Sequence, residues 1–193
     1  MKKTGIIFVV SGPSGSGKTT LIKHLLKDRN LKNILTKSVS VTTRPKRRNE
    51  KGGKDYFFIR KTQFKELLRR KKIIEWTSYL DYFYATPKDY LDRQLKTGRH
   101  IILCLDTKGA WAIKRIYPEN TVTIFILPPK IEALKQRIHL RSRGGREENL
   151  PMRLKLAKKE ISLAKQYDYQ IVNDDFPWAL KELKEIITKR IGC

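Results

Sequence analysis

The stretch Gly12-Pro13-Ser14-Gly15-Ser16-Gly17-Lys18-Thr19 matches the phosphate-binding pattern G-x-x-x-x-G-K-[ST] at every defined position. An apolar, β-branched run at 6–10 leads into it, and a helix-like stretch at 20–27 follows it. Glycines let successive backbone N–H groups turn toward one anion, and the start of a helix adds partial positive charge. Lys18 can reach the β- and γ-phosphates, and the Thr19 hydroxyl can hold Mg²⁺. A Gly/Ser-rich turn could match by chance, but strand, loop and helix in register favour a nucleoside triphosphate site.

The length and composition of the chain limit its architecture. With 193 residues it can form one well-buried core with small inserted subdomains, but not two large domains. It has no run of about eighteen apolar residues, so we expect no membrane span. Cys104 and Cys193 show no metal-ligand spacing; the first lies in an expected buried strand and the second ends the chain. We therefore expect no disulfide and a location in the reducing cytoplasm.

The chain is strongly basic, with 43 Lys and Arg residues against 19 Asp and Glu residues and a formal net charge of +24. A chain of this charge can bind nucleic acid through backbone phosphates alone. The basic residues are, however, spread along the whole sequence, without a basic tail or an aromatic-interleaved recognition motif. We interpret them as solvated helix faces and a polyphosphate site, and expect nucleic acid to bind only weakly and nonspecifically, if at all.

Apolar runs and helical periodicity alternate along the sequence. Strands are expected at 5–11, 35–41, 55–59, 73–79, 100–105, 121–127 and 169–173. Helices are expected at 18–28, 61–71, 87–97, 107–116, 130–142, 147–166 and 176–190. Strand–helix alternation at both ends of the chain predicts an α/β fold, with a mainly parallel sheet flanked by helices.

Two stretches break this alternation. Residues 36–89 combine closely spaced short strands with many Tyr, Arg and Thr residues, which predicts an inserted small α+β subdomain. Residues 141–149 are polar and Arg-dense, contain two glycines and lie between two expected helices, which is typical of a mobile lid over phosphates. We therefore divide the chain into a core (1–35, 90–130 and 155–193), an insert (36–89) and a lid at about 131–154.

The insert carries four motifs in order: Ser38-Val39-Ser40-Val41-Thr42-Thr43-Arg44-Pro45-Lys46-Arg47, Gly53-Lys54-Asp55-Tyr56-Phe57-Phe58, Ile74-Glu75-Trp76 and Tyr84. They closely resemble the nucleotide-acceptor region of guanylate kinases. With the phosphate loop, Asp106, the lid and Ile171-Val172-Asn173-Asp174-Asp175, the resemblance runs through nearly the whole chain. The phosphate loop alone would indicate only a large superfamily, whereas the insert motifs are far more specific. The chain is therefore identified as a member of the guanylate kinase family, which implies a P-loop NTPase core, an inserted nucleotide-acceptor subdomain and a lid.

This resemblance implies Mg²⁺-dependent transfer of the terminal phosphoryl group of ATP to GMP, and to dGMP, with ADP and GDP as products of the GMP reaction. Glu75 matches the glutamate that reads the guanine base, and Asp106 assists it. Ser40 and Thr86 match positions whose hydroxyls complete base recognition. A guanine edge presents two adjacent donors, which an ionised carboxylate accepts as a pair. Taken singly, Glu75 or Asp106 could instead be a surface or helix-capping carboxylate.

The resemblance also implies a clamp on the acceptor phosphate, formed by Arg44, Arg47, Tyr56 and Tyr84. Arginine suits this position because its planar fork binds phosphate in a bidentate manner. Adenine in the same pocket would set an acceptor against Glu75 and leave buried groups unpaired, at about 1–3 kcal/mol each.

For the donor side, the resemblance implies that residues 12–19 bind ATP, namely Gly12, Pro13, Ser14, Gly15, Ser16, Gly17, Lys18 and Thr19. The attacking group is already an ionised phosphate oxygen, so catalysis needs alignment and charge neutralisation rather than a general base. Lys18 follows the γ-phosphate and Thr19 holds Mg²⁺, while Arg44 bridges the two phosphates. Arg137 and Arg153 match lid positions, although each could instead be a solvated surface charge.

The sequence departs from the family pattern at several positions. Cys104 replaces the first of two acids that usually flank one apolar residue, so the orientation of magnesium-bound water is in doubt unless another group substitutes. Lys108 stands where glutamine is common, and Ala85 stands where glycine is usual. The lid is one residue longer than usual, so either Arg141 or Arg143 could take the family role. These changes concern efficiency more than reaction class.

Two other classes of function remain open from the sequence. A kinase of the same fold acting on another nucleotide or on a ribose bisphosphate would keep the loop without needing Ser40, Glu75 and Asp106 together. A non-catalytic binding module derived from guanylate kinases would typically have a damaged loop, whereas Lys18 and Thr19 are intact here. The enzyme interpretation is favoured, with a monomer or a small homo-oligomer as the expected assembly.

Overall fold

The computed structural model describes residues 4–48, 50–141 and 150–192. Its central sheet has five strands in the order β2-β7-β1-β8-β9, and every neighbouring pair is parallel. The strands are β1 (Ile7–Ser11), β2 (Leu35–Lys37), β7 (His100–Cys104), β8 (Thr121–Leu127) and β9 (Tyr169–Val172). Fully parallel sheets need helices on both faces, because their crossovers return over the sheet. The expected α/β class with a mainly parallel sheet is confirmed.

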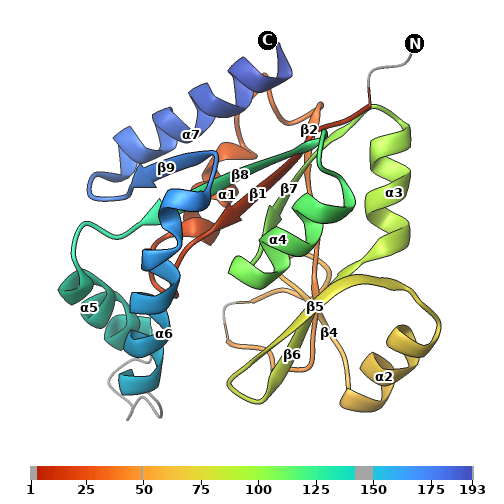
Figure 1. Ribbon diagram of the computed structural model, residues 1–193, viewed down its shortest axis with the longest axis horizontal. Coiled ribbons are helices and arrows are strands. Elements are labelled where there is room, and N and C mark those ends of the chain that lie inside the picture. Colours follow the sequence, from red (N-terminus) through yellow and green to blue (C-terminus); the bar gives the residue numbers. More distant parts are fainter. Residues whose placement is uncertain (1–3, 49, 142–149, 193) are drawn as a thin grey trace.

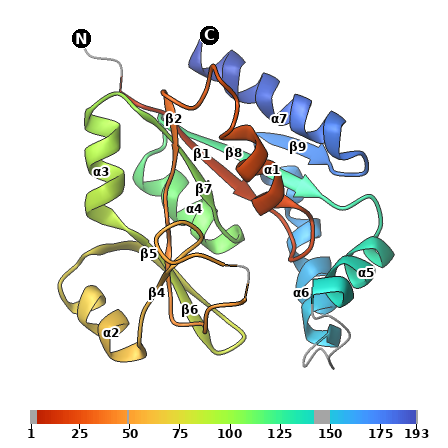
Figure 2. The same cartoon turned by 180° about the vertical axis from the view of Figure 1, so that it is seen from behind.

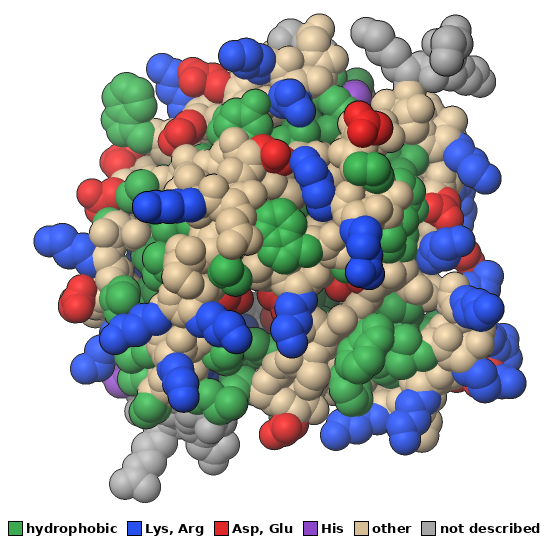
Figure 3. All heavy atoms as spheres, viewed as in Figure 1, with side chains coloured by type: hydrophobic (Ala, Val, Ile, Leu, Met, Phe, Trp, Pro, Cys, Tyr) green, Lys and Arg blue, Asp and Glu red, His purple; other side chains and the backbone are tan. Residues whose placement is uncertain are grey.

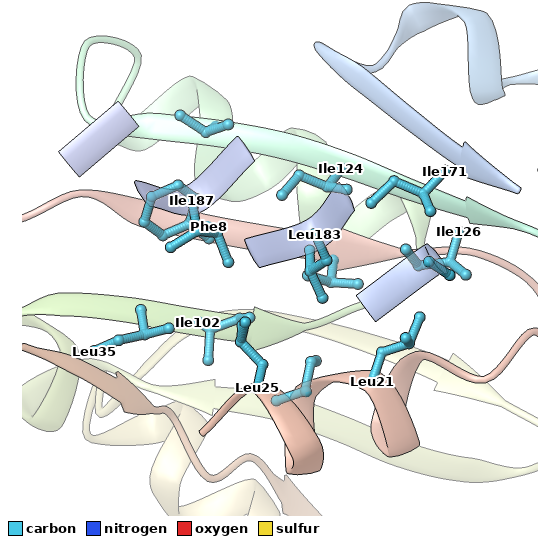
Figure 4. Close-up of a cluster of buried hydrophobic side chains, with 14 of the residues drawn as sticks. Phe8, Leu21, Leu25, Leu35, Ile102, Ile124, Ile126, Ile171, Leu183 and Ile187 are labelled. Atoms are coloured by element: carbon cyan, nitrogen blue, oxygen red, sulfur yellow. The ribbon is translucent and has the colours of Figure 1, made fainter. Parts of the chain in front are cut away.

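Helices cover both faces of this sheet (Figure 1). Alternate side chains of β1 point to opposite faces, so Phe8 and Val10 belong to one core cluster and Ile7 and Val9 to another. The first cluster lies under α1 (Lys18–Leu25) and α7 (Phe176–Ile191), and the second lies under α3 (Lys88–Lys96) and α4 (Thr107–Ile116). Figure 4 shows the first cluster, in which Leu183 and Ile187 of α7 face the sheet. Because helices pack on both faces of the sheet, the strand ends from which the loops emerge are fixed in place.

A second, four-stranded sheet has the order β4-β3-β6-β5 and lies at one end of the central sheet (Figure 1). Its strands are β3 (Val41–Thr42), β4 (Phe57–Phe58), β5 (Ile73–Tyr79) and β6 (Tyr82–Pro87). Helix α2 (Lys61–Arg69) covers it and buries Phe64 against Val41 and Ala85. All four strands lie within 36–89, the range predicted as an insert; the division itself remains a prediction.

Two sequence expectations in this region are wrong. Residues 35–41 form not one strand but β2 and the start of β3, which belong to different sheets. Strand β6 was not expected at all. It pairs antiparallel with β5 through a tight turn at Leu80 and Asp81, whose φ angles are 49° and 63°. Such turns usually carry Gly or Asn because φ is positive at both central residues, so this sequence lacked the usual signal.

Helices α5 (Ile131–Arg141) and α6 (Leu150–Ser162) pack against each other beside the central sheet, with Leu134 and Ala157 buried between them. The helix expected at 147–166 is wrong at its C-terminal end: α6 stops at Ser162 and a short 3₁₀ helix, η1 (Ala164–Gln166), follows. The stretch expected to form a mobile lid falls mostly at 142–149, outside the described residues. In the ranges that are described, no helix is both long and apolar enough to cross a membrane.

Candidate active site

The phosphate-binding loop connects β1 to α1, as the sequence predicted (Figure 2). Gly12, Gly15 and Gly17 have φ angles of 138°, 92° and 96°, a region that side chains other than glycine rarely adopt. Gly17 also has no room for a side chain, because a Cβ there would lie 2.1 Å from Nδ2 of Asn173. Helix α1 begins at Lys18, so its N-terminal N–H groups face the loop. The loop is therefore shaped by its backbone to receive an anion.

A side chain from the far end of the chain supports this loop. Asn173, which directly follows β9, is buried and donates from Nδ2 to the carbonyl oxygen of Ser16 at 2.7 Å. The backbone carbonyl oxygen of Asn173 accepts a hydrogen bond from the guanidinium of Arg137 in α5 at 3.2 Å. Sequence reasoning assigned Asn173 no role. The available signal was its place directly after the last parallel strand, where loops of the central sheet gather.

Lys18 and Thr19 occupy the first turn of α1. The Lys18 ammonium donates back to the carbonyl oxygens of Gly12 and Pro13 at 2.5 and 2.9 Å. These two carbonyl groups hold the ammonium over the loop. Thr19 is exposed to solvent, which leaves its hydroxyl accessible from outside the protein.

The hairpin β5–β6 presents a buried carboxylate. Glu75 of β5 lies opposite Thr86 of β6, whose hydroxyl donates to Oε1 of Glu75 at 2.5 Å. Only 7% of Glu75 is exposed, and burial raises its pKa to about 7; the nearby Asp106 adds to the rise, while the bonds from Thr86 oppose it. Gly109 of α4 lies against the same carboxylate, since a Cβ there would be 2.8 Å from Oε2. Glu75 therefore joins the second sheet to the central core.

Asp106 caps the N-terminus of α4, where its side chain accepts a hydrogen bond from the backbone N–H of Gly109 at 2.8 Å. The capping role considered for this carboxylate from sequence is therefore present, and it places Asp106 close to Glu75. Ser40 is also buried, immediately before β3, and its carbonyl oxygen accepts from the N–H of Phe57 at 2.9 Å. The four residues predicted to read the base come from the second sheet, its entry segment and the start of α4.

A second cluster in this region contains Arg44, Tyr56 and Tyr84. The Tyr56 and Tyr84 rings meet edge to face with centroids 5.9 Å apart, and the Arg44 guanidinium lies 5.6 Å from the Tyr56 ring centroid. Burial raises the pKa of Tyr56 well above its usual value, and the nearby Cys104 thiol and Tyr84 hydroxyl add to the rise. Tyr56 is therefore a neutral hydrogen-bond donor at physiological pH.

Arg44 and Arg47 share a carboxylate that sequence reasoning missed. Glu50 accepts a hydrogen bond from the Arg44 guanidinium at 2.7 Å and another from the backbone N–H of Arg47 at 2.9 Å. Burial alone would lower the pKa of Arg44, but Glu50 and the Tyr84 hydroxyl outweigh this effect and raise it. Glu50 lies near the end of the Arg-rich motif, which was a signal for a charge partner. Its ion pair fixes the position of the Arg44 guanidinium beside Tyr56.

Arg137 lies on α5 and Arg153 on α6, so the two arginines predicted for the lid come from both of its helices. Arg137 contacts the phosphate loop through Asn173, and Arg153 is near enough to lower the pKa of Tyr79, whose main perturbation is a rise caused by burial. Arg141 ends α5, but its side chain lies outside the described part of the structure, as does the whole of Arg143. The choice between them remains open.

The surface of the molecule has a hollow in this region. Figure 3 shows it between α6 and the β5–β6 hairpin, below α4, with acidic side chains at its floor and Lys and Arg side chains around its rim. The phosphate loop and the second sheet approach it from different sides of the molecule (Figures 1 and 2). The hollow therefore suits a ligand that carries both a negatively charged part and a part with hydrogen-bond donors.

Cys104 and Ala85, two positions at which the sequence departs from the family pattern, both lie in the described part of the structure. Cys104 ends β7, is half-buried, packs against the core under α1 and lies near Tyr56. Ala85 is buried in the second sheet against Phe64 and Val41, so its methyl group fills space in a small core. Neither residue disrupts the elements that position the site.

A phosphate loop at the end of a parallel strand, with a second sheet that carries a buried carboxylate, defines a P-loop nucleotide-binding protein with a second site for hydrogen-bond donors. The family model for guanylate kinase matches residues 4–190. The guanylate kinase of Rickettsia prowazekii is 42% identical over 186 residues, which is 96% of this chain and 92% of the relative. That of Caldanaerobacter subterraneus is 39% identical over 188 residues, 97% of this chain and 88% of the relative. The crystal structure of guanylate kinase from Anaplasma phagocytophilum superposes with a TM-score of 0.81 at 35% identity, covering 98% of this chain and 87% of that one. This chain belongs to the guanylate kinase family.

Proposed function

We propose that this protein transfers the terminal phosphoryl group of ATP to GMP, giving ADP and GDP, and that it acts on dGMP in the same way. The observation that carries this proposal is the buried, hydrogen-bonded pair of Glu75 and Thr86, together with the glycine-shaped phosphate loop at the start of α1. The loop supplies a triphosphate site, and the pair supplies an acceptor surface for adjacent donors. The family membership supports the same reaction.

Recognition of the base rests on the Glu75 carboxylate. In its ionised form it accepts the ring N–H and the amino group of guanine together. Thr86 holds the carboxylate in place through its hydroxyl, and Asp106 and Ser40 complete the pocket. Adenine presents an acceptor at the corresponding ring position, so it would leave Glu75 unpaired at a cost of about 1–3 kcal/mol.

The phosphate of GMP is proposed to bind Arg44, Arg47, Tyr56 and Tyr84. Arg44 would exchange its ion pair with Glu50 for a bidentate contact with phosphate, so the guanidinium is already ordered before the substrate arrives. Tyr56 donates a neutral hydrogen bond from its buried ring. Because the attacking oxygen of GMP is already ionised, the protein needs to align it rather than deprotonate it.

ATP is proposed to bind residues 12–19. The glycine-shaped backbone cradles the phosphates, and Lys18 would leave the carbonyls of Gly12 and Pro13 to follow the γ-phosphate. Arg137 and Arg153 approach the transferring group from the lid helices. Together these cations offset the negative charge that two nucleotides bring into one hollow.

The residues present fit Mg²⁺ as the metal. The exposed Thr19 hydroxyl is a hard oxygen ligand at the start of α1, and the described residues contain no cluster of three or more His, Cys, Asp or Glu side chains that could hold a metal alone. Such a site suits Mg²⁺, which commonly takes one or two protein oxygens together with phosphate oxygens and water. When bound, Mg²⁺ neutralises charge on the β- and γ-phosphates.

We also propose that the protein works in the cytoplasm, in purine nucleotide metabolism, as a monomer or small homo-oligomer. Its substrates are free nucleotides, and its two cysteines fit a reducing compartment.

The test is ADP formation from ATP and Mg²⁺ with GMP, dGMP, AMP, CMP, UMP or ribose bisphosphate offered separately. We expect a strong preference for GMP, followed by dGMP. A preference for another acceptor would instead assign the chain to a different kinase activity of the same fold. ATP binding without turnover on any acceptor would indicate a non-catalytic binding module.

A further inference from the structure

A buried side-chain amide lies directly against the phosphate loop, and the proposed reaction gives it no part. Asn173 follows β9 and is only 5% exposed. Its Nδ2 donates to the carbonyl oxygen of Ser16 at 2.7 Å. A Cβ on Gly17 would lie 2.1 Å from the same Nδ2, so the amide also packs closely on Gly17. The Asn173 side chain therefore contacts the loop at the two residues that directly precede α1.

The backbone on both sides of Asn173 is fixed by the core of the protein. The N–H of Asn173 donates to the carbonyl oxygen of Leu127, at the end of β8, at 2.8 Å. Two residues further on, Asp175 caps α7 by accepting from the N–H of Trp178 at 2.9 Å. One side of Asn173 is thus attached to the central sheet and the other to a helix that covers it. Asn173 is therefore a fixed support for the loop, not a surface side chain that follows it.

The same residue also contacts a helix of the proposed lid. Helix α5 follows β8 and lies beyond the C-terminal end of that strand (Figure 1). The guanidinium of Arg137 in α5 donates to the backbone carbonyl oxygen of Asn173 at 3.2 Å. The contact with Ser16 spans 157 residues of sequence and the contact with Arg137 spans 36, so neither arises from a local turn. Asn173 thus joins the donor loop to a cation that is proposed to reach the transferring phosphoryl group.

An asparagine suits this position for a chemical reason. The Ser16 carbonyl oxygen is an acceptor, so its partner must be a donor, and the amide donates without placing a charge beside the loop. An ionised Asp of the same size would set a second acceptor against the carbonyl group. A longer Gln would run into Gly17, which leaves no room for further atoms.

We infer that Asn173 is a positioning residue for phosphoryl transfer, which holds the start of α1 and the Arg137 guanidinium in one fixed spatial relation. This inference rests on the proposed function. The side-chain amide sets the position of the segment that carries Lys18, and the backbone carbonyl group sets the position of Arg137. Both cations have to meet the same phosphoryl group, and a displacement of about 1 Å can lower a reaction rate on the order of 100-fold.

The experiment is a double-mutant cycle of the wild type, Asn173→Ala, Arg137→Ala and the double variant. Turnover at saturating ATP and GMP and the KM for GMP are measured at a temperature at which circular dichroism shows all four proteins folded. For Asn173→Ala we expect turnover to fall at least about tenfold, with the KM for GMP within about twofold of the wild type. Because both residues act through one contact, adding Asn173→Ala to Arg137→Ala should lower turnover by at most about a further threefold.

Two further variants separate the hydrogen bond from the size of the side chain. Asn173→Asp keeps the size but replaces the donor by an acceptor, so it should lose turnover at least as strongly as Asn173→Ala. It takes the place of Asn173→Ala in the cycle if the alanine variant does not fold. Asn30→Ala changes an exposed asparagine in the turn after α1 and should match the wild type in turnover and in KM.

Wild-type turnover in folded Asn173→Ala or Asn173→Asp would overturn the inference. It would also be overturned by losses that multiply in the double variant, or by a fall in turnover with an equal rise in the KM for GMP, since the latter indicates damage to the whole site. The wild type reports separately on the proposed function. Absence of transfer to GMP in the wild type would refute that function, whereas multiplied losses in an enzyme that does transfer to GMP would refute only the role of Asn173.

Discussion

The donor and acceptor halves of this site are built in different ways. The donor half is one continuous segment, 12–19, whose backbone conformation faces an anion because three glycines adopt positive φ angles. The acceptor half is made of side chains from separate segments, in which Glu75 depends on Thr86 and Gly109, and Arg44 depends on Glu50. Backbone N–H groups carry no net charge and do not titrate, whereas a buried carboxylate does.

This difference separates the two tasks of such a kinase. Any nucleoside triphosphate presents similar phosphates to the loop, so the donor half can rely on backbone and a single lysine. Choosing one base among several requires acceptors and donors at fixed positions, which buried side chains provide. We therefore expect changes in the donor half to affect catalysis with any acceptor, and changes in the acceptor half to affect the choice of acceptor.

The largest effect is expected in the donor half. Lys18→Ala removes the cation proposed to follow the γ-phosphate, and turnover should fall by about 10²–10³-fold, as when other preorganised charge-stabilising groups are removed. A coupled assay of ADP formation measures this, and circular dichroism checks that the fold persists. Lys23→Ala, an exposed lysine on the same helix, is the matched control and should retain wild-type turnover. Turnover near that of the wild type in Lys18→Ala would refute the donor assignment.

The next effect should be confined to the acceptor half. Glu75→Gln replaces one of two acceptor oxygens by an amide donor, so kcat/KM for GMP should fall by about 10–100-fold, corresponding to roughly 1–3 kcal/mol for mispaired buried groups. The dissociation constant for ATP should not change, and Glu119→Gln, at an exposed position, serves as control. Equal losses for both nucleotides would show that Glu75 supports the whole site rather than reading the base.

A smaller effect should appear on changing the pH. Since the pKa of Glu75 is about 7 and guanine binds its ionised form, protonation competes with GMP as the pH falls. The value of kcat/KM for GMP should fall about fourfold between pH 8 and pH 6.5, which follows from the ionised fraction of a group with this pKa. Binding of ATP should lack this dependence on Glu75, because loop N–H groups do not titrate. If Glu75→Gln shows the same pH profile as the wild type, another group is responsible.

The smallest effect is expected at the boundary between the two halves. Cys104→Asp restores an acid at the end of β7, and turnover at low Mg²⁺ should stay unchanged or rise by no more than about threefold, a range equivalent to under 1 kcal/mol. Cys104→Ser, which is polar but uncharged, separates the effect of charge from that of size. A large loss in Cys104→Asp would show instead that the thiol is fitted to the core under α1 and to Tyr56.

Much of the fold could be predicted from sequence because its signals are local. The strand at 7–11, the loop and α1 follow one another with apolar, glycine and helical signals in register, and α7 begins at a capping Asp175 followed by Pro177. The predictions of secondary structure that were wrong concern segments whose structure depends on tertiary contacts. Strand β6 follows a turn of Leu80 and Asp81 that lacks glycine, and 35–41 reads as one strand although its halves pair in different sheets.

The site residues show the same division between those found from local sequence signals and those that depend on tertiary contacts. The phosphate loop was found from its own pattern, and Glu75 was found through its place in a motif that resembles guanylate kinases. Asn173 and Glu50 were not assigned roles, because the partner of Asn173 is distant in sequence and Glu50 lies just outside the quoted motifs. The positions of both residues were weak signals, and only the fold shows which partner each one binds.

By itself, the sequence determined the phosphate loop, the α/β alternation and the family, because these depend on short stretches with strict conformational or chemical requirements. Only the tertiary structure decided how deeply Glu75 is buried, and hence that burial raises its pKa to about 7. It also decided that Asn173 supports the loop and that Glu50 orders Arg44. The physical reason is that burial and electrostatic contact depend on distances between segments, which a linear pattern of residues does not contain.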